Sequence, residues 1–106
     1  MKVTVKGRKA GKETTYEFDL LDRYDPEKRV ISMARTTGYT ATVAARMLHA
    51  GLYDTRGVSA PEFIGRNPRC VEFMLDGLAR RGIHYVLHRD GVSTAVRRPL
   101  ACSTAD

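Results

Sequence analysis

The spacing of the apolar residues changes along this chain, and that change constrains the fold more than any other feature. Apolar and polar residues alternate over 3–6 and again over 16–20, which is the period of half-buried β-strands. A turn-rich segment separates the two runs, so they predict an antiparallel hairpin. Alternation returns over 83–88, and after an Arg-Asp-Gly turn a weaker partner strand is expected over 92–96.

Helical spacing fills the middle of the chain. One stretch covers 32–48, and a second begins at Asn67 and Pro68, which suit the cap and the first position of a helix, and stops at Gly82. A connector rich in glycine and proline, 51–66, joins them. The sequence therefore predicts an α+β domain in which an N-terminal antiparallel hairpin, two main helices and a C-terminal strand or hairpin surround one core.

Length and composition limit the classes of protein to consider. A chain of 106 residues is enough for one small domain, which we expect to span 1–98, with a disordered tail over 99–106. No apolar run approaches a membrane span and no secretory signal is evident, so we expect a cytoplasmic protein. Cys70 and Cys102 lack the paired Cys/His spacing of a zinc site or a disulfide framework. The net charge of +6 invites a nucleic-acid interpretation, but the basic residues are scattered and no aromatic stacking strand accompanies them.

A polar cluster interrupts the first helical stretch where packing alone does not require it: Arg35, Thr36, Thr37, Gly38 and Tyr39. A guanidinium and two hydroxyls suit a carboxylate or a phosphate, and Gly38 would let a ligand approach closely. If the helix begins near Thr36 or Thr37, its first amides would point at the same anion. Alternatively, one threonine is only an N-cap. We favour a helix that starts before Gly38, at a cost of about 1 kcal/mol relative to alanine.

Other polar residues give weaker signals. His84 and His88 would lie on one face of a strand about 13 Å apart, too far to share an ion by themselves. The carboxylates of Asp19, Asp22 and Asp25 are expected to be exposed charges. We therefore predict no catalytic residue and no metal site. The Gly-x-Gly-x-x-Gly loop of a dinucleotide-binding domain is also missing, so NAD or NADP is not expected to bind this chain alone.

Three sequence blocks occur in a characteristic order between about 32 and 83: TTGYTATVAARMLHAG, GVSAPE and FMLDGLARRGI. With the preceding Val-x-Val-x-Gly hairpin, they resemble the end of the saccharopine dehydrogenase and lysine 6-dehydrogenase family. The resemblance implies the C-terminal, substrate-side and dimerisation part of an NAD(P)-dependent amino-acid oxidoreductase acting on a C–N bond in lysine metabolism. It also implies that this part is inactive without the Rossmann domain of a full-length chain. We expect it to be excised from such a chain, with a separately encoded remnant as the alternative.

By the same resemblance, Arg35, Thr36, Thr37, Gly38 and Tyr39 are carried over as residues facing the amino-acid substrate or the cofactor. Saccharopine, free lysine, a carboxyalkyl polyamine and another amino acid all remain open as substrates. Two alternatives also remain: a small basic structural or assembly domain that forms a homodimer, and a nucleic-acid-binding domain whose affinity would fall steeply with salt.

Overall fold

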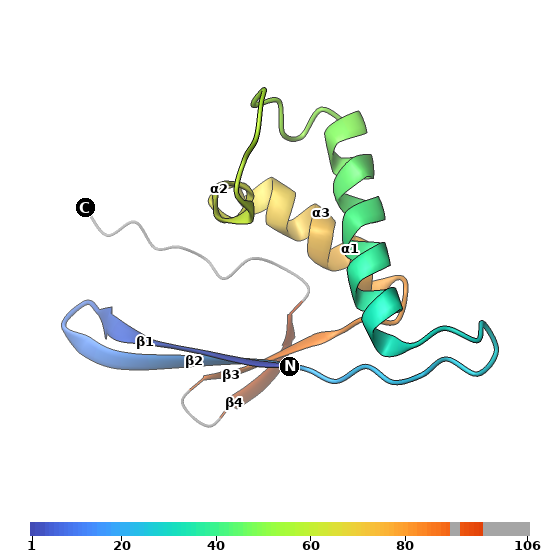
Figure 1. The fold of residues 1–106 in the computed structure, drawn as a ribbon. Helices are drawn as coiled ribbons and strands as arrows, with labels where there is room; N and C mark the ends of the chain where they lie inside the picture. The colour runs from blue at the N-terminus through green and yellow to red at the C-terminus, as the bar shows by residue number, and fades with distance from the viewer. Residues whose placement is uncertain (90–91, 97–106) are drawn as a thin grey trace.

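The computed structural model describes residues 1–89 and 92–96. Its strands are β1 (Lys2–Lys9), β2 (Lys12–Leu20), β3 (Tyr85–Arg89) and β4 (Val92–Val96), and its helices are α1 (Ser32–His49), α2 (Pro61–Gly65) and α3 (Pro68–Ala79). The strands form one antiparallel sheet in the order β1-β2-β3-β4, and the helices lie on one side of it (Figure 1). The predicted α+β fold is confirmed. The expected tail over 99–106, the boundary at 98 and most of the turn over 89–91 lie outside the described residues.

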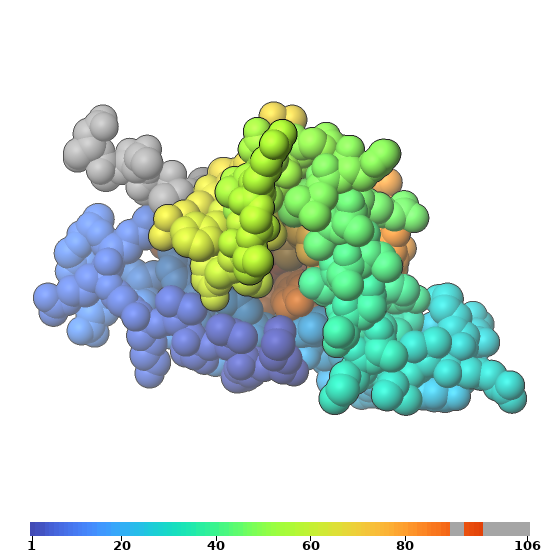
Figure 2. Space-filling view, turned by 45° about the horizontal axis from the view of Figure 1, so that its top comes forward, coloured from blue at the N-terminus to red at the C-terminus, as the bar shows by residue number. Residues whose placement is uncertain are grey.

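The β1–β2 hairpin turns at Ala10 and Gly11, which stand between the paired residues Lys9 and Lys12. Both turn residues have positive φ, 50° for Ala10 and 76° for Gly11, as a two-residue hairpin turn of the primed kind requires. The tip of this hairpin extends beyond the helical layer (Figure 2). Apolar and polar residues alternate along it as predicted, but the helices cover only part of its apolar face.

The strand register separates an apolar face from a polar face. On the apolar face Val3 pairs with Phe18, which in turn pairs with Leu87. Leu20 and Leu87 are buried beneath the helices, whereas Val3 and Val5 on the edge strand are 44% and 51% exposed. The core therefore sits over β2 and β3, and β1 contributes little to it.

The helices close the core from above. Leu20, Leu78 and Ile83 form its centre, with Tyr39 and Tyr85 packed against them. The predicted start of the second helix is confirmed, because the side-chain oxygen of Asn67 accepts from the amide of Arg69 at 3.0 Å. The helix ends at Ala79, and Gly82 has a φ of +78° in the turn that follows it. The short helix α2 lies inside the segment expected to be only a connector.

Candidate functional site

Helix α1 begins at Ser32, three residues before the polar cluster. The helix therefore starts before Gly38, as favoured, and neither Thr36 nor Thr37 caps it. Ile31 occupies the N-cap position without any side-chain hydrogen bond. An anion site built on first-turn amides at Thr36 or Thr37 is wrong, because both residues lie inside the helix.

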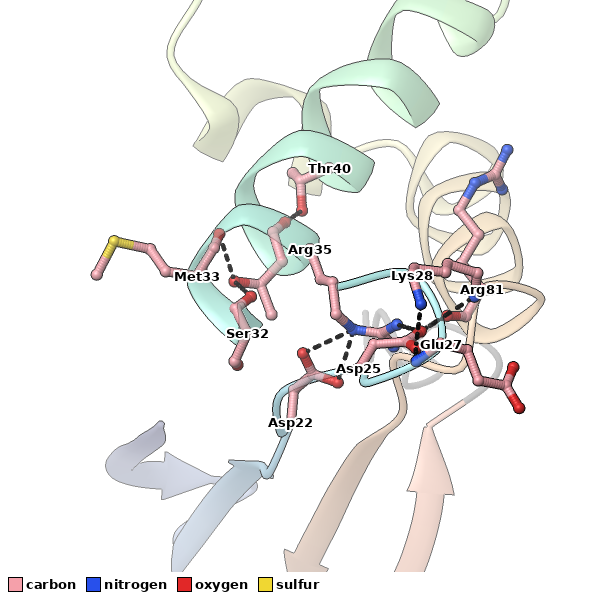
Figure 3. Close-up of polar contacts among 10 residues, drawn as sticks. Asp22, Asp25, Glu27, Lys28, Ser32, Met33, Arg35, Thr40 and Arg81 are labelled. Atoms are coloured by element: carbon pink, nitrogen blue, oxygen red, sulfur yellow. Dashed lines mark hydrogen bonds and ion pairs between the residues drawn. The ribbon is translucent and has the colours of Figure 1, made fainter. Parts of the chain in front are cut away.

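Arg35 is a buried residue of α1, and its guanidinium forms ion pairs with two carboxylates. Its Nε lies 3.1 Å from Oδ2 of Asp22 and its Nη1 lies 2.7 Å from Oδ2 of Asp25 (Figure 3). Its Nη2 donates to the backbone oxygen of Arg81 at 3.4 Å. Every nitrogen of the guanidinium thus has a partner within the chain, and the bridge ties α1 to the segment after β2 and to the turn after α3.

The expectation that these carboxylates are exposed is wrong for Asp22 and Asp25, whose side chains are 8% and 15% exposed. The hydrogen bond to Asp22 raises the pKa of Arg35 above its ordinary value. The backbone amide of Lys28, followed by its ammonium, lowers the pKa of Asp25. Both shifts favour the ionised forms of Arg35 and Asp25, and with them the paired arrangement.

A groove of about 630 Å³ lies beside this bridge, between the end of β2 and the exposed flank of α1. Its lining residues are Met1, Leu20, Leu21, Asp22, Ser32, Thr36, Thr37, Thr40, Ala41 and Tyr85. The lining combines hydroxyls and one carboxylate with a few apolar side chains. The groove can therefore hold a ligand that has both a polar group and an aliphatic part.

The structure divides the predicted site residues into two groups. Thr36 and Thr37 line the groove, whereas Arg35, Gly38 and Tyr39 are not among its lining residues. Tyr39 packs against the core with its ring 5.7 Å from the guanidinium carbon of Arg35. Gly38 faces open space, because a Cβ built there would meet nothing within 4 Å. Sequence reasoning missed Asp22 as a groove residue. The available signal was Arg35, which shares the buried side of α1 with Val43 and Met47 and therefore needs a carboxylate partner.

A second polar cluster occupies the opposite face of the sheet. Glu17, Asp19 and His88 each place one potential ligand atom within 4.8 Å of the others. The ammonium of Lys2 already lies 2.8 Å from Glu17 Oε1 and 3.9 Å from Asp19 Oδ2, and His88 Nε2 lies 3.0 Å from Asp19 Oδ2. The ammonium of Lys2 therefore occupies the place beside these carboxylates that a metal ion would take.

The family described as the saccharopine dehydrogenase C-terminal domain matches residues 1–83, which include the hairpin, all three helices and the Arg35 bridge. The chain belongs to this family. No solved structure gave a significant match. All groove residues of this saccharopine dehydrogenase C-terminal domain except Tyr85 fall within the matched range. Among the described residues, no helix is long and apolar enough to cross a membrane.

Proposed function

We propose that this domain is the substrate-side part of a cytoplasmic, NAD(P)-dependent oxidoreductase of lysine metabolism that acts on a C–N bond and is inactive alone. The observation that carries the proposal is the groove beside α1 in a saccharopine dehydrogenase C-terminal domain. Thr36 and Thr37 expose their side chains on its wall and would orient polar groups of an amino-acid substrate. Saccharopine, lysine and a carboxyalkyl polyamine are the candidate substrates.

The nicotinamide cofactor does not fit the described part of this chain. Dinucleotides bind where a parallel strand leads through a glycine-rich loop into a helix, so that helix amides meet the pyrophosphate. Here the strands of the described sheet are all antiparallel, and no glycine-rich loop precedes α1 or α3. NAD or NADP would therefore belong to a partner Rossmann domain, against which the groove would close.

The proposal changes the role assigned to Arg35. A guanidinium that already contacts Asp22, Asp25 and the Arg81 carbonyl has no free fork for a substrate carboxylate. Arg35 is instead a positioning residue that fixes the segment carrying Asp22 against α1. Tyr39, about one turn further along the helix, packs against the core and lies beside the same guanidinium.

Reconstitution tests the proposal. The chain would be mixed with the nucleotide-binding domain of a saccharopine dehydrogenase that lacks its own C-terminal domain, and reduced nicotinamide would be followed with each candidate substrate. We expect turnover only in the mixture, and a lower kcat/KM for Thr37→Val. Thr42→Val is the matched control, because Thr42 lies on the same helix but outside the groove lining. A mixture that associates but stays inactive with every substrate would contradict the proposal.

One observation supports a second candidate function, assembly of a homodimer. Every residue of β1 is exposed at one edge of the sheet, and Val3 and Val5 leave apolar surface uncovered there. An exposed edge strand offers unpaired backbone groups to a second strand. Light scattering of the chain and of a Val3→Lys, Val5→Lys double variant tests this function; a monomer at all concentrations for both would exclude it.

A further inference from the structure

Two of the three groove threonines, Thr36 and Thr40, present acceptors rather than donors. Thr36 Oγ1 donates to the backbone oxygen of Ser32 at 3.0 Å, and Thr40 Oγ1 donates to that of Thr36 at 2.6 Å. Each hydroxyl hydrogen is thus directed into the helix itself. A threonine hydroxyl has one hydrogen and two lone pairs, so what remains for a ligand is a lone pair on each oxygen.

The side-chain charge on the groove wall also favours a ligand that donates hydrogen bonds. Within the part of the chain that the structure describes, Asp22 carries the only charged side chain that lines the groove, and it is negative. Its two oxygens share a single donor, Nε of Arg35, at 3.3 and 3.1 Å. Since an ionised carboxylate has about four lone-pair positions, Asp22 retains acceptor capacity after this pairing. Met1 also lines the groove, and its ammonium donates to the backbone oxygen of Leu20 at 2.7 Å.

The dipole of α1 would favour a ligand of the opposite charge, because the start of a helix stabilises anions. That preference falls off within the first turn. Thr36 and Thr40 lie beyond the first turn of a helix that begins at Ser32. Moreover, the guanidinium of Arg35, in the first part of this helix, is buried and is matched by two carboxylates, Asp22 and Asp25.

We propose that the groove binds the ammonium end of an aminoalkyl ligand, with Asp22, Thr36 and Thr40 as acceptors and Arg35 as the residue that positions Asp22. The aliphatic part of the ligand would lie against Leu20, Leu21 and Ala41. This inference rests on the proposed function and narrows it, because it assigns to this domain the amine of the substrate rather than its carboxylate.

A matched pair of small probes tests the charge preference. The chain would be titrated with n-pentylammonium chloride and, separately, with sodium pentanoate at equal ionic strength, while backbone amide shifts are followed by NMR. We expect pentylammonium at millimolar concentrations to shift the amides of Thr36, Thr37 and Thr40, and pentanoate to leave them unchanged. Pentanoate shifting these amides, or neither probe shifting them, would overturn the proposal.

Two variants test the acceptors. Thr40→Val removes an exposed hydroxyl while keeping the side-chain shape, and should weaken pentylammonium binding about threefold to tenfold. Asp22→Asn should weaken it by at least about tenfold, provided that the variant remains folded. Thr42→Val is the control, since Thr42 donates in the same way to the backbone oxygen of Gly38, at 3.0 Å, but does not line the groove. Equal affinity in Thr40→Val and Thr42→Val would contradict the assignment.

The ammonium proposal and the proposed function can fail separately. If the mixture with a nucleotide-binding domain oxidises a substrate but pentylammonium does not bind the groove, only the ammonium assignment is wrong. If pentylammonium binds as described and the associated mixture remains inactive, the oxidoreductase proposal is wrong and the groove is an amine site of another kind.

Discussion

Gly77 of α3 faces Val43 of α1 so closely that a Cβ on the glycine would lie 2.7 Å from Cγ1 of the valine. Val43 is 1% exposed and β-branched, so it has little freedom to move aside. We expect Gly77→Ala to lower the free energy of unfolding by about 1–2 kcal/mol, since overpacking outweighs the better helix propensity of alanine. Urea denaturation measures this change.

The double variant Gly77→Ala, Val43→Ala tests the cause. If the clash is responsible, the two substitutions are coupled and the loss in the double variant is smaller than the sum of the single losses. Strict additivity would show that Gly77 matters for another reason.

Gly38 should respond in the opposite sense. It lies inside α1 with open space where a Cβ would stand, so alanine gains helix propensity without a clash. We expect Gly38→Ala to raise the free energy of unfolding by about 1 kcal/mol. Because Gly38 is outside the groove lining, binding of pentylammonium should not change. A loss of binding without a loss of stability would restore Gly38 as a ligand-facing residue.

The fold was predictable because local signals agreed with one another. Alternation over β1 and β2, the Asn67-Pro68 helix start and the Gly82 stop each specify their own element through backbone chemistry. Burial was less predictable, because alternation identifies an apolar face but not what covers it. Val3 and Val5 have the pattern of a covered strand, yet they lie on the sheet edge beyond the helices.

The site was only partly predictable for a related reason. Arg35, Tyr39, Val43 and Met47 recur every four residues on the inner side of α1. Three of them, Arg35, Val43 and Met47, are buried. An arginine in such a row requires carboxylate partners. Asp22 and Asp25 are close in sequence, but only the fold brings their oxygens to the guanidinium, and a sequence pattern does not specify that distance.

The fork geometry of Arg35 is expected to matter beyond its charge. A lysine at this position keeps the charge but cannot contact Asp22, Asp25 and the Arg81 carbonyl together. We expect Arg35→Lys to lower the melting temperature by roughly 5–10 °C. Arg46→Lys, an exposed position in the last turn of the same helix, is the control and should change it little. Equal melting temperatures for the two variants would show that charge alone suffices.

The hairpin turn stores strain that a substitution can relieve. Ala10 has a φ of 50°, a left-handed conformation that costs an alanine about 1 kcal/mol and suits asparagine followed by glycine. We therefore expect Ala10→Asn to raise the free energy of unfolding by about 0.5–1 kcal/mol, measured by urea denaturation. Gly11→Ala, at a φ of 76°, should lower it by a similar amount. No change in either variant would indicate that the hairpin tip opens independently of the core.

Asp25 should make stability depend on pH in the acid range. Its pKa is lowered in the folded chain, chiefly by the Lys28 amide, from an ordinary value of 3.8. The folded state therefore binds the proton less readily than the unfolded state, so this stabilisation is complete above 3.8 and is lost as pH falls through the folded pKa. Urea denaturation of the wild type and Asp25→Asn at a series of pH values measures it. We expect the difference between the two to be constant near neutral pH and to shrink on acidification below about pH 4. If the difference in the free energy of unfolding stays constant down to pH 2, the charge of Asp25 does not contribute to stability.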